Sequence, residues 1–243
     1  MNAFDAGILH WLNEFAQQSP AFDLAMRFVS TANLLKGELI MMLFWWAWFA
    51  RGERGDARER ASRDRQVLLC TLFACIAAIL VGRGLAHFLP FRVRPAYNPA
   101  LSFVAPYGAT NEALGMRLWS SFPSDHAMLF SALATGLLMI SRPLGVAAYV
   151  YWVAVIGFPR IYLGMHYPTD VIGGAALGAG LAWLACQDAV RRPIVRWPLA
   201  LLEARPGLFY AAFFLFTAEV GSMFNDLRML LSMVVTHLGL RGG

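Results

Sequence analysis

The sequence predicts an all-α, polytopic membrane protein: a bundle of about six transmembrane helices with an N-terminal amphipathic helix. Of the 243 residues, 58% are hydrophobic and only 14% are charged, whereas soluble domains average roughly 45–50% and 25%. The apolar residues also gather in long blocks, which is the pattern of membrane-spanning helices. We treat residues 1–243 as a single membrane-embedded domain, because one domain is sufficient for a chain of this length.

The N-terminal segment, residues 1–18, has apolar side chains at helical spacing, and its polar residues, Asp5 among them, occupy the other positions. It is too mixed to cross a bilayer. We therefore expect an interfacial helix that lies on the membrane with its apolar face inward. A second helix is expected from about residue 21 to residue 33.

Six apolar blocks are predicted to span the membrane, and the fifth carries glycines that favour close helix contact. The blocks are residues 36–50, 66–89, 124–140, 144–158, 170–187 and 208–224. A charged loop (51–65), a long connection rich in proline (90–123) and a basic loop (188–205) separate them. The tail, 225–243, is expected to form a weakly amphipathic helix.

Arginine counts predict the orientation. If the spans alternate, loops 51–65, 141–143 and 188–205 share one side and hold eleven arginines, against four in loops 90–123 and 159–169. The positive-inside rule places the first set in the cytoplasm. The same rule accounts for the pI of about 9.4 without a nucleic-acid partner, and it predicts that the second set of loops faces outward.

Three of the five histidines, His87, His126 and His166, lie at the outward ends of predicted spans, where ionisable residues indicate function. Arginines lie at the same level of the chain: Arg92, Arg94 and Arg160. Histidines that exchange protons and guanidinium groups that bind planar oxyanions together predict a site for a phosphate group.

The strings around these residues resemble, in order and spacing, the three signature motifs of the type 2 phosphatidic acid phosphatase (PAP2) superfamily. They read HFLPFRVRP from His87, SFPSDHA around His126, and RIYLGMHYPTD from Arg160 to Asp170. The motif core is thus residues 87–170. Asp125 replaces the glycine of the second motif, and in this it is similar to bacterial enzymes that act on undecaprenyl diphosphate.

Two residues depart from the family pattern: His87 stands at the position of the first-motif lysine, and Pro159 at that of a serine. A protonated His87 can donate a hydrogen bond to phosphate, but only in a pH-dependent way. Two interpretations remain open for His87, a phosphate donor or an ordinary interfacial residue. In the second case Arg92 or Arg83 would supply the permanent charge.

Phosphoryl transfer spreads negative charge over three equatorial oxygens, and the resemblance implies the same roles as this chemistry. Arg94, Arg160, Ser124 and His87 are the candidates for holding the phosphate. Asp125 is also a candidate, although capping of its helix is the preferred interpretation. His166 is expected to attack phosphorus, with Asp170 orienting its ring through the other ring nitrogen, and His126 to transfer protons.

The sequence therefore predicts a lipid phosphatase of the bacterial inner membrane with its active site facing outward. Undecaprenyl diphosphate is the favoured substrate, the intermediate is a phosphohistidine, and the resemblance implies a site without metal or cofactor. Membrane lipids are the only other expected partners. Two alternatives stay open on the same residues: a lipid-to-lipid phosphotransferase, and a lipid-phosphate transporter or scramblase without chemistry.

Overall fold

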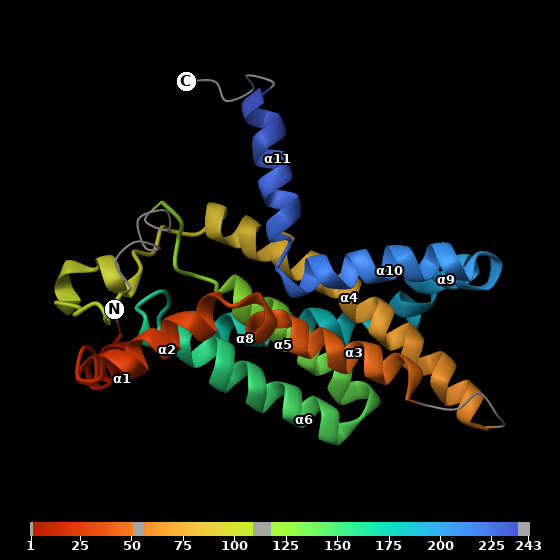
Figure 1. Ribbon diagram of the computed structural model, residues 1–243, viewed down its shortest axis with the longest axis horizontal. Coiled ribbons are helices and arrows are strands. Elements are labelled where there is room, and N and C mark those ends of the chain that lie inside the picture. Colours follow the sequence, from red (N-terminus) through yellow and green to blue (C-terminus); the bar gives the residue numbers. More distant parts are fainter. Residues whose placement is uncertain (1, 51–55, 109–117, 238–243) are drawn as a thin grey trace.

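The computed structural model describes residues 2–50, 56–108 and 118–237, and over these ranges the regular structure is entirely helical (Figure 1). The centre of the bundle is made by α4 (Asp56–Phe88), α5 (Asp125–Ile140) and α8 (Pro168–Ala185), with α5 in contact with both of the others. Helix α5 is apolar on all sides, and its residues from Ala127 to Leu137 are buried without a break. A helix of this kind belongs in the interior of a bundle.

Glycine permits the closest of these contacts. A Cβ on Gly178 of α8 would lie 1.9 Å from the carbonyl oxygen of Met128 on α5, and one on Gly136 of α5 would lie 2.1 Å from Thr71 Oγ1 on α4. No side chain fits at either position. The expectation that the small residues of the fifth apolar block allow close helix packing is met at Gly174 and Gly178.

Outer helices surround this centre. Helix α3 (Leu39–Phe49) follows the π-helical η1 (Leu34–Glu38) and packs with its tryptophans on α10 (Pro206–Gly221). Helix α6 (Arg142–Tyr151), η5 (Trp152–Gly157) and α7 (Phe158–Tyr162) form one continuous rod. The last helix, α11 (Asn225–His237), projects away from the bundle (Figure 1).

The chain is a multi-pass membrane protein. Among the described residues, two helices, Arg58–Phe88 and Arg142–Tyr162, are long and apolar enough to cross a membrane, and α8 followed by α9 (Asp188–Ala204) makes a third candidate, bent by 75°. Helices α5 and α10 are apolar but shorter. The count of six spans stays a prediction.

Two expected loops are helical. Of the predicted loop 51–65, residues 51–55 lie outside the described residues, and from Asp56 onward the chain is already part of α4. The predicted loop 188–205 is largely α9, which buries Arg191 and Val195 and contacts both α4 and α10. High arginine content indicated a loop, but an amphipathic helix accommodates arginines equally well on its polar face.

The N-terminal helices each bury a carboxylate, and the interfacial position of the first helix stays a prediction. Helix α1 (Ala3–Asn13) leaves the aromatic side chains of Phe4 and Trp11 more than half exposed, while Asp5 is fully buried. Helix α2 (Pro20–Thr31) likewise buries Asp23. Asp5 binds Thr169 at the start of α8, and Asp23 binds Tyr162 at the end of α7. Because buried carboxylates require polar partners, these contacts hold the two helices against the bundle.

Candidate active site

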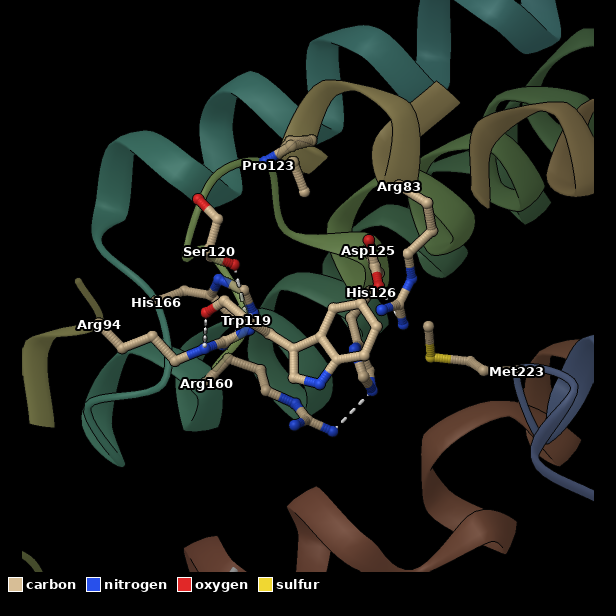
Figure 2. A pocket seen from close by; sticks show the side chains of 11 residues that line it. Arg83, Arg94, Trp119, Ser120, Pro123, Asp125, His126, Arg160, His166 and Met223 are labelled. Atoms are coloured by element: carbon tan, nitrogen blue, oxygen red, sulfur yellow. Dashed lines mark hydrogen bonds and ion pairs between the residues drawn. The ribbon is translucent and has the colours of Figure 1, made fainter. Parts of the chain in front are cut away.

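A cavity of about 520 Å³ opens where α4 ends and where α5 and α8 begin, and it collects most of the predicted phosphate-site residues (Figure 2). Its lining consists of Arg83, Ala86, Arg94, Trp119, Ser120, Pro123, Asp125, His126, Arg160, His166 and Met223. Three sequence segments that are far apart thus converge, as the resemblance implied. Of the predicted residues, His87, Ser124 and Asp170 are not in the lining.

His166 lies in the short connection between α7 and α8 and is 5% exposed. The connection folds back so that the backbone N–H of His166 donates to the carbonyl of Arg160, 3.2 Å away. This contact brings the first and middle residues of the third motif into the same cavity. One tight turn at the end of α7 therefore brings Arg160 and His166 together at the spacing that they have in the sequence.

The contacts of His166 define its tautomer. Nε2 lies 3.3 Å from Nη1 of Arg94, and Nδ1 lies 2.8 Å from the carbonyl oxygen of Ser121. A guanidinium has only donors and a carbonyl only acceptors, so Nδ1 carries the proton and Nε2 the lone pair. That lone pair is on the side of the ring that faces Arg94.

The electrostatics keep this ring neutral. Burial lowers the pKa of His166 well below its usual 6.5, and the nearby positive charges of Arg94 and Arg160 lower it further. The hydrogen bond to Ser121 acts in the opposite direction but is a smaller effect. A neutral imidazole with an available lone pair is the form that can act as a nucleophile.

Asp170 does not contact His166 in the predicted way. Its Oδ2 lies 3.9 Å from Nδ1 of His166, which is beyond hydrogen-bond distance. The carboxylate instead accepts from Ser121 Oγ at 2.5 Å and from the backbone N–H of Tyr167 at 2.8 Å. Ser121 therefore links the two, since its hydroxyl binds Asp170 and its carbonyl binds His166.

Arg94 donates to the backbone carbonyls of Met165 at 2.8 Å and of Ser120 and Trp119 at 3.3 Å. Within the described residues its hydrogen-bond partners are carbonyls and the neutral His166 ring, all uncharged. Burial lowers the pKa of Arg94, yet a guanidinium stays protonated in proteins. Its positive charge is therefore fixed in place beside the cavity.

Arg160 is 9% exposed and lines the same cavity as Arg94, with its guanidinium directed toward His126 (Figure 2). Its Nη2 lies 2.6 Å from Nε2 of His126 and 3.2 Å from the carbonyl of Ser30 on α2. Because the guanidinium can only donate, Nε2 of His126 accepts in this arrangement. The histidine of the second motif and the arginine of the third are thus held together.

Three predicted phosphate ligands are placed elsewhere or paired. The Ser124 hydroxyl accepts from Ala127 N–H and caps α5, so Ser124 rather than Asp125 is the cap residue. Asp125 forms an ion pair with Arg83 at 2.8 Å. His87 is exposed at the end of α4, outside the lining, with its ring against Phe88.

Arg83 takes the place in the cavity that His87 does not occupy. It lies one helical turn before His87 on α4, pairs with Asp125, and stacks its guanidinium 4.5 Å from the ring centre of Trp119. Arg92, the other alternative, faces away from the cavity and bonds to Asp5 and Asp170. The only indication in the sequence that Arg83 could replace His87 was its position on the same face of α4.

Comparison with known proteins agrees with these motifs. The family model described as the PAP2 superfamily matches residues 67–193, which is more than half of the chain. The chain belongs to the PAP2 superfamily. The superfamily match extends on both sides of the motif core, from within α4 into α9.

Relatives include the bacitracin transport permease protein BcrC of Bacillus licheniformis, 28% identical over 59% of this chain and 66% of that protein. An undecaprenyl-diphosphatase of Sulfolobus acidocaldarius is 34% identical over 54% and 60%. The undecaprenyl-diphosphatase BcrC of Bacillus subtilis is 25% identical over 79% and 89%. The chain thus spans less than two thirds of the length of the first two relatives.

A solved structure, the PAP2-type phosphatidylglycerolphosphate phosphatase of Bacillus subtilis, aligns with a TM-score of 0.46 at 22% identity. The alignment covers 74% of this chain and 81% of that one. At this level the structural similarity adds nothing to the family assignment, which rests on the sequence match.

Proposed function

We propose that this PAP2 protein hydrolyses a lipid phosphate or diphosphate, with undecaprenyl diphosphate the favoured substrate, through a phosphohistidine on His166. The observation that carries the proposal is the position of the Nε2 lone pair of His166. It belongs to a neutral imidazole, lines the cavity, and has the guanidinium of Arg94 beside it. A nucleophile next to fixed positive charge is the arrangement that phosphoryl transfer requires.

In the proposed first step, Nε2 of His166 forms a bond to phosphorus while the bond from phosphorus to the leaving oxygen breaks. His126 takes up a proton from water once phosphate displaces it from Arg160, and it gives this proton to the leaving oxygen. Arg94 and Arg160 hold the equatorial oxygens, whose negative charge increases in the transition state. Binding of the phosphate to Arg160 releases His126 from the guanidinium that it contacts in the free enzyme.

In the second step, water attacks the phosphohistidine and His126 takes a proton from it. The bond between Nε2 and phosphorus breaks, which restores neutral His166 and releases inorganic phosphate. The Ser121 carbonyl accepts a hydrogen bond from Nδ1–H of His166 in both steps and stabilises the ring while it is positively charged. The carboxylate of Asp170 influences the His166 ring in two ways. It accepts a hydrogen bond from the Ser121 hydroxyl, and its negative charge lies 3.9 Å from Nδ1 of His166.

A second, apolar cavity of about 760 Å³ supports a lipid substrate. It lies between α4, α10 and α11, and it shares Arg83, Asp125 and Met223 with the phosphate cavity. The rest of its wall is almost entirely aliphatic or aromatic, for example Ile79 of α4 and Leu215 and Phe216 of α10. Since the phosphate and chain of a lipid are covalently joined, a chain leaving the first cavity past Met223 enters the second.

Arg83 supports the preference for a diphosphate. It lies at the boundary of the two cavities, where the phosphate nearer to the lipid would be when the terminal phosphate is at His166. Arg83 already forms an ion pair with Asp125, so an incoming phosphate competes with that carboxylate for the guanidinium. We propose that Arg83, in place of the first-motif lysine, binds this second phosphate.

We expect the proposed site to act without a metal ion, as the family resemblance implies. Over the described residues, no group of three or more His, Cys, Asp and Glu side chains is placed to hold a metal ion. The positive charge that phosphoryl transfer requires is provided by arginines instead. Activity is therefore expected to persist in the presence of a strong chelator and to be inhibited by vanadate, which mimics five-coordinate phosphorus.

The test is release of phosphate from a panel of labelled lipid phosphates by the purified protein, with His166→Ala and His10→Ala side by side. His10 is an exposed histidine on α1 and serves as the matched control. We expect the wild type and His10→Ala to release inorganic phosphate, and His166→Ala to release none. Label that moves to another lipid would indicate a phosphotransferase, and binding without turnover would indicate a transporter; either result contradicts hydrolysis.

A further inference from the structure

The carboxylate of Asp5, on the N-terminal helix α1, is built into the third-motif region. Asp5 is 0% exposed. Its Oδ1 accepts from the backbone N–H of Thr169 at 2.9 Å, and its Oδ2 accepts from Thr169 Oγ1 and from Nη2 of Arg92, both at 2.7 Å. A buried charge with three well-formed hydrogen bonds is a demanding arrangement that few positions provide.

Thr169 lies in the first turn of α8, where backbone N–H groups have no partner within their own helix. Asp5 therefore caps α8 from a different part of the chain, next to the residue that supplies the Asp170 carboxylate. Leu9 of α1 adds an apolar contact, because it is packed in one cluster with Tyr167. The N-terminal helix thus holds the start of α8 from outside.

Arg92 connects Asp5 to the cavity. Its guanidinium bonds to both Asp5 and Asp170. Asp170 accepts from Ser121 Oγ at 2.5 Å, and the carbonyl of Ser121 accepts from Nδ1 of His166 at 2.8 Å. Four hydrogen bonds therefore lead from α1 to the ring that we assign as the nucleophile.

The charge balance along this route gives Asp5 a role beyond anchoring. Arg92 lies between two fully buried carboxylates, so each takes part of its charge. Arg92 and Ser121 donate to different oxygens of Asp170, Oδ1 and Oδ2. Without the Asp5 charge, Arg92 would be attracted to Asp170 alone, and a carboxylate drawn toward Arg92 would weaken its hydrogen bond with Ser121. The orientation of the His166 ring depends on that bond through the Ser121 carbonyl.

We propose that Asp5 is a positioning residue for phosphoryl transfer, through which helix α1 supports the active site. The proposal rests on the assignment of His166 as nucleophile. It predicts an effect on the chemical step at saturating substrate, whereas a purely structural role for Asp5 predicts a loss of stability only.

Asp23 provides the matched control. It is also a fully buried aspartate in the N-terminal region, and it accepts from the backbone N–H groups of Gln17 and Tyr107 and from the hydroxyl of Tyr162. Over the part of the chain that the structure describes, it makes no hydrogen bond or ion pair with Arg92, Thr169 or Asp170. Asp23→Asn and Asp5→Asn therefore remove the same charge from equally buried sites, but only the second is joined to His166.

The experiment measures kcat, KM and the melting temperature of Asp5→Asn, Asp23→Asn, Arg92→Gln and the double variant Asp5→Asn/Arg92→Gln. For Asp5→Asn we expect kcat to fall roughly ten- to a hundredfold, as for other residues that orient a reacting group through a partner, with KM nearly unchanged. The double variant should lose less activity than the product of the two single effects, because Asp5 and Arg92 share one hydrogen-bonded route to His166. Asp23→Asn should lose stability and keep its kcat.

Thr169→Val is a second route if Asp5→Asn does not fold, since it removes the hydroxyl that Asp5 and Arg92 share. It should lower kcat in the same direction. The proposal is overturned if Asp5→Asn or, where that variant does not fold, Thr169→Val keeps the wild-type kcat, if Asp23→Asn lowers kcat equally, or if the Asp5 and Arg92 effects multiply.

Vanadate binding separates this proposal from the proposed function. The rise in melting temperature on adding vanadate requires an ordered phosphate site but no particular substrate. If the wild type hydrolyses no lipid phosphate yet is stabilised by vanadate, the proposed function is contradicted and this readout replaces kcat. A vanadate shift that is reduced in Asp5→Asn and intact in Asp23→Asn then supports the positioning role. Equal shifts in the two variants, or none in the wild type, contradict it.

Discussion

Both ends of helix α4 are rich in arginine, but the arginines have different surroundings. At one end Arg94 and Arg160 are largely buried and are held by carbonyls, a thioether and histidine rings. At the other end Arg58, Arg63 and Arg192 surround a shallow hollow, and Arg192 is 75% exposed with a loose ion pair to Asp188 at 3.4 Å. Arg191 is also buried at this end, where it pairs with Asp188 at 2.8 Å. Arginine number therefore predicts orientation, whereas buried arginines that meet histidine rings at a cavity identify the site.

The largest difference between the two ends should appear on removing single guanidinium groups. Arg94→Ala and Arg160→Ala each remove a donor to the developing charge and should lower kcat by roughly 10²–10³-fold. Arg192→Ala should change it less than about twofold, because an exposed ion pair contributes little. Phosphate release from the same lipid substrate measures all three. Comparable losses at both ends would contradict the placement of the site.

Arg83 and His87 sharpen the comparison within the site end of α4. Arg83→Gln should lower kcat/KM for a lipid diphosphate by roughly tenfold, the effect of about one charge-assisted hydrogen bond, and should affect the corresponding monophosphate less. His87→Ala should behave like the wild type at every pH, because His87 is exposed outside the cavity. Paired assays on the two substrates decide this. If His87→Ala is impaired and His87→Lys is active with a flatter alkaline decline, the histidine replaces the family lysine after all.

The pH profile tests the electrostatics of the site end. The acid limb of kcat/KM reports the base of the free enzyme, here His166, whose pKa lies well below 6.5 because of burial and of Arg94 and Arg160. Activity should therefore persist below pH 6.5 and disappear only as the pH falls through that lowered pKa. Arg94→Gln removes one positive charge, so the residual activity should show an acid limb at higher pH. A wild-type acid limb at or above pH 6.5 would contradict a neutral, buried nucleophile.

The sidedness of the two ends gives the last prediction, which involves no change in activity. The three native cysteines are buried, so a thiol reagent should react only with a cysteine introduced at an exposed position. Ser62→Cys at the basic end and Tyr107→Cys in the connection 90–123, which is predicted to face outward, are both at exposed positions. An impermeant thiol reagent applied to intact cells should label Tyr107→Cys and leave Ser62→Cys unlabelled until the cells are opened. The reverse pattern would place the active site in the cytoplasm.

Much of this architecture was predictable because the signals are local. Apolar blocks identify helices, and the family motifs place Arg94, His126, Arg160 and His166 around one cavity. The spacing of these residues, however, does not specify hydrogen bonds. Asp170 has the expected position four residues after His166, yet its carboxylate bonds to Ser121, the first residue of the second-motif string, to which the motifs assigned no role.

Long-range polar contacts were the part that the sequence did not reveal. Asp5 occurs in an amphipathic segment, and its polarity suggested a solvent-facing position. It is buried because Thr169 and Arg92, far away in the chain, provide partners for it. Similarly, α9 was expected to be a loop because its arginines were counted without regard to their helical period. In both cases the missing information was which face of a helix meets the rest of the protein.

The central claim is that His166 carries the phosphoryl group during turnover, and mass spectrometry of the quenched enzyme tests it most directly. Wild-type protein turning over a lipid phosphate is quenched at alkaline pH, where phosphohistidine survives, and is then digested and analysed. We predict phosphate on the peptide that contains His166 and on no other histidine, and none in His166→Ala. Sustained turnover by His166→Ala, or phosphate found on another residue, would contradict the account.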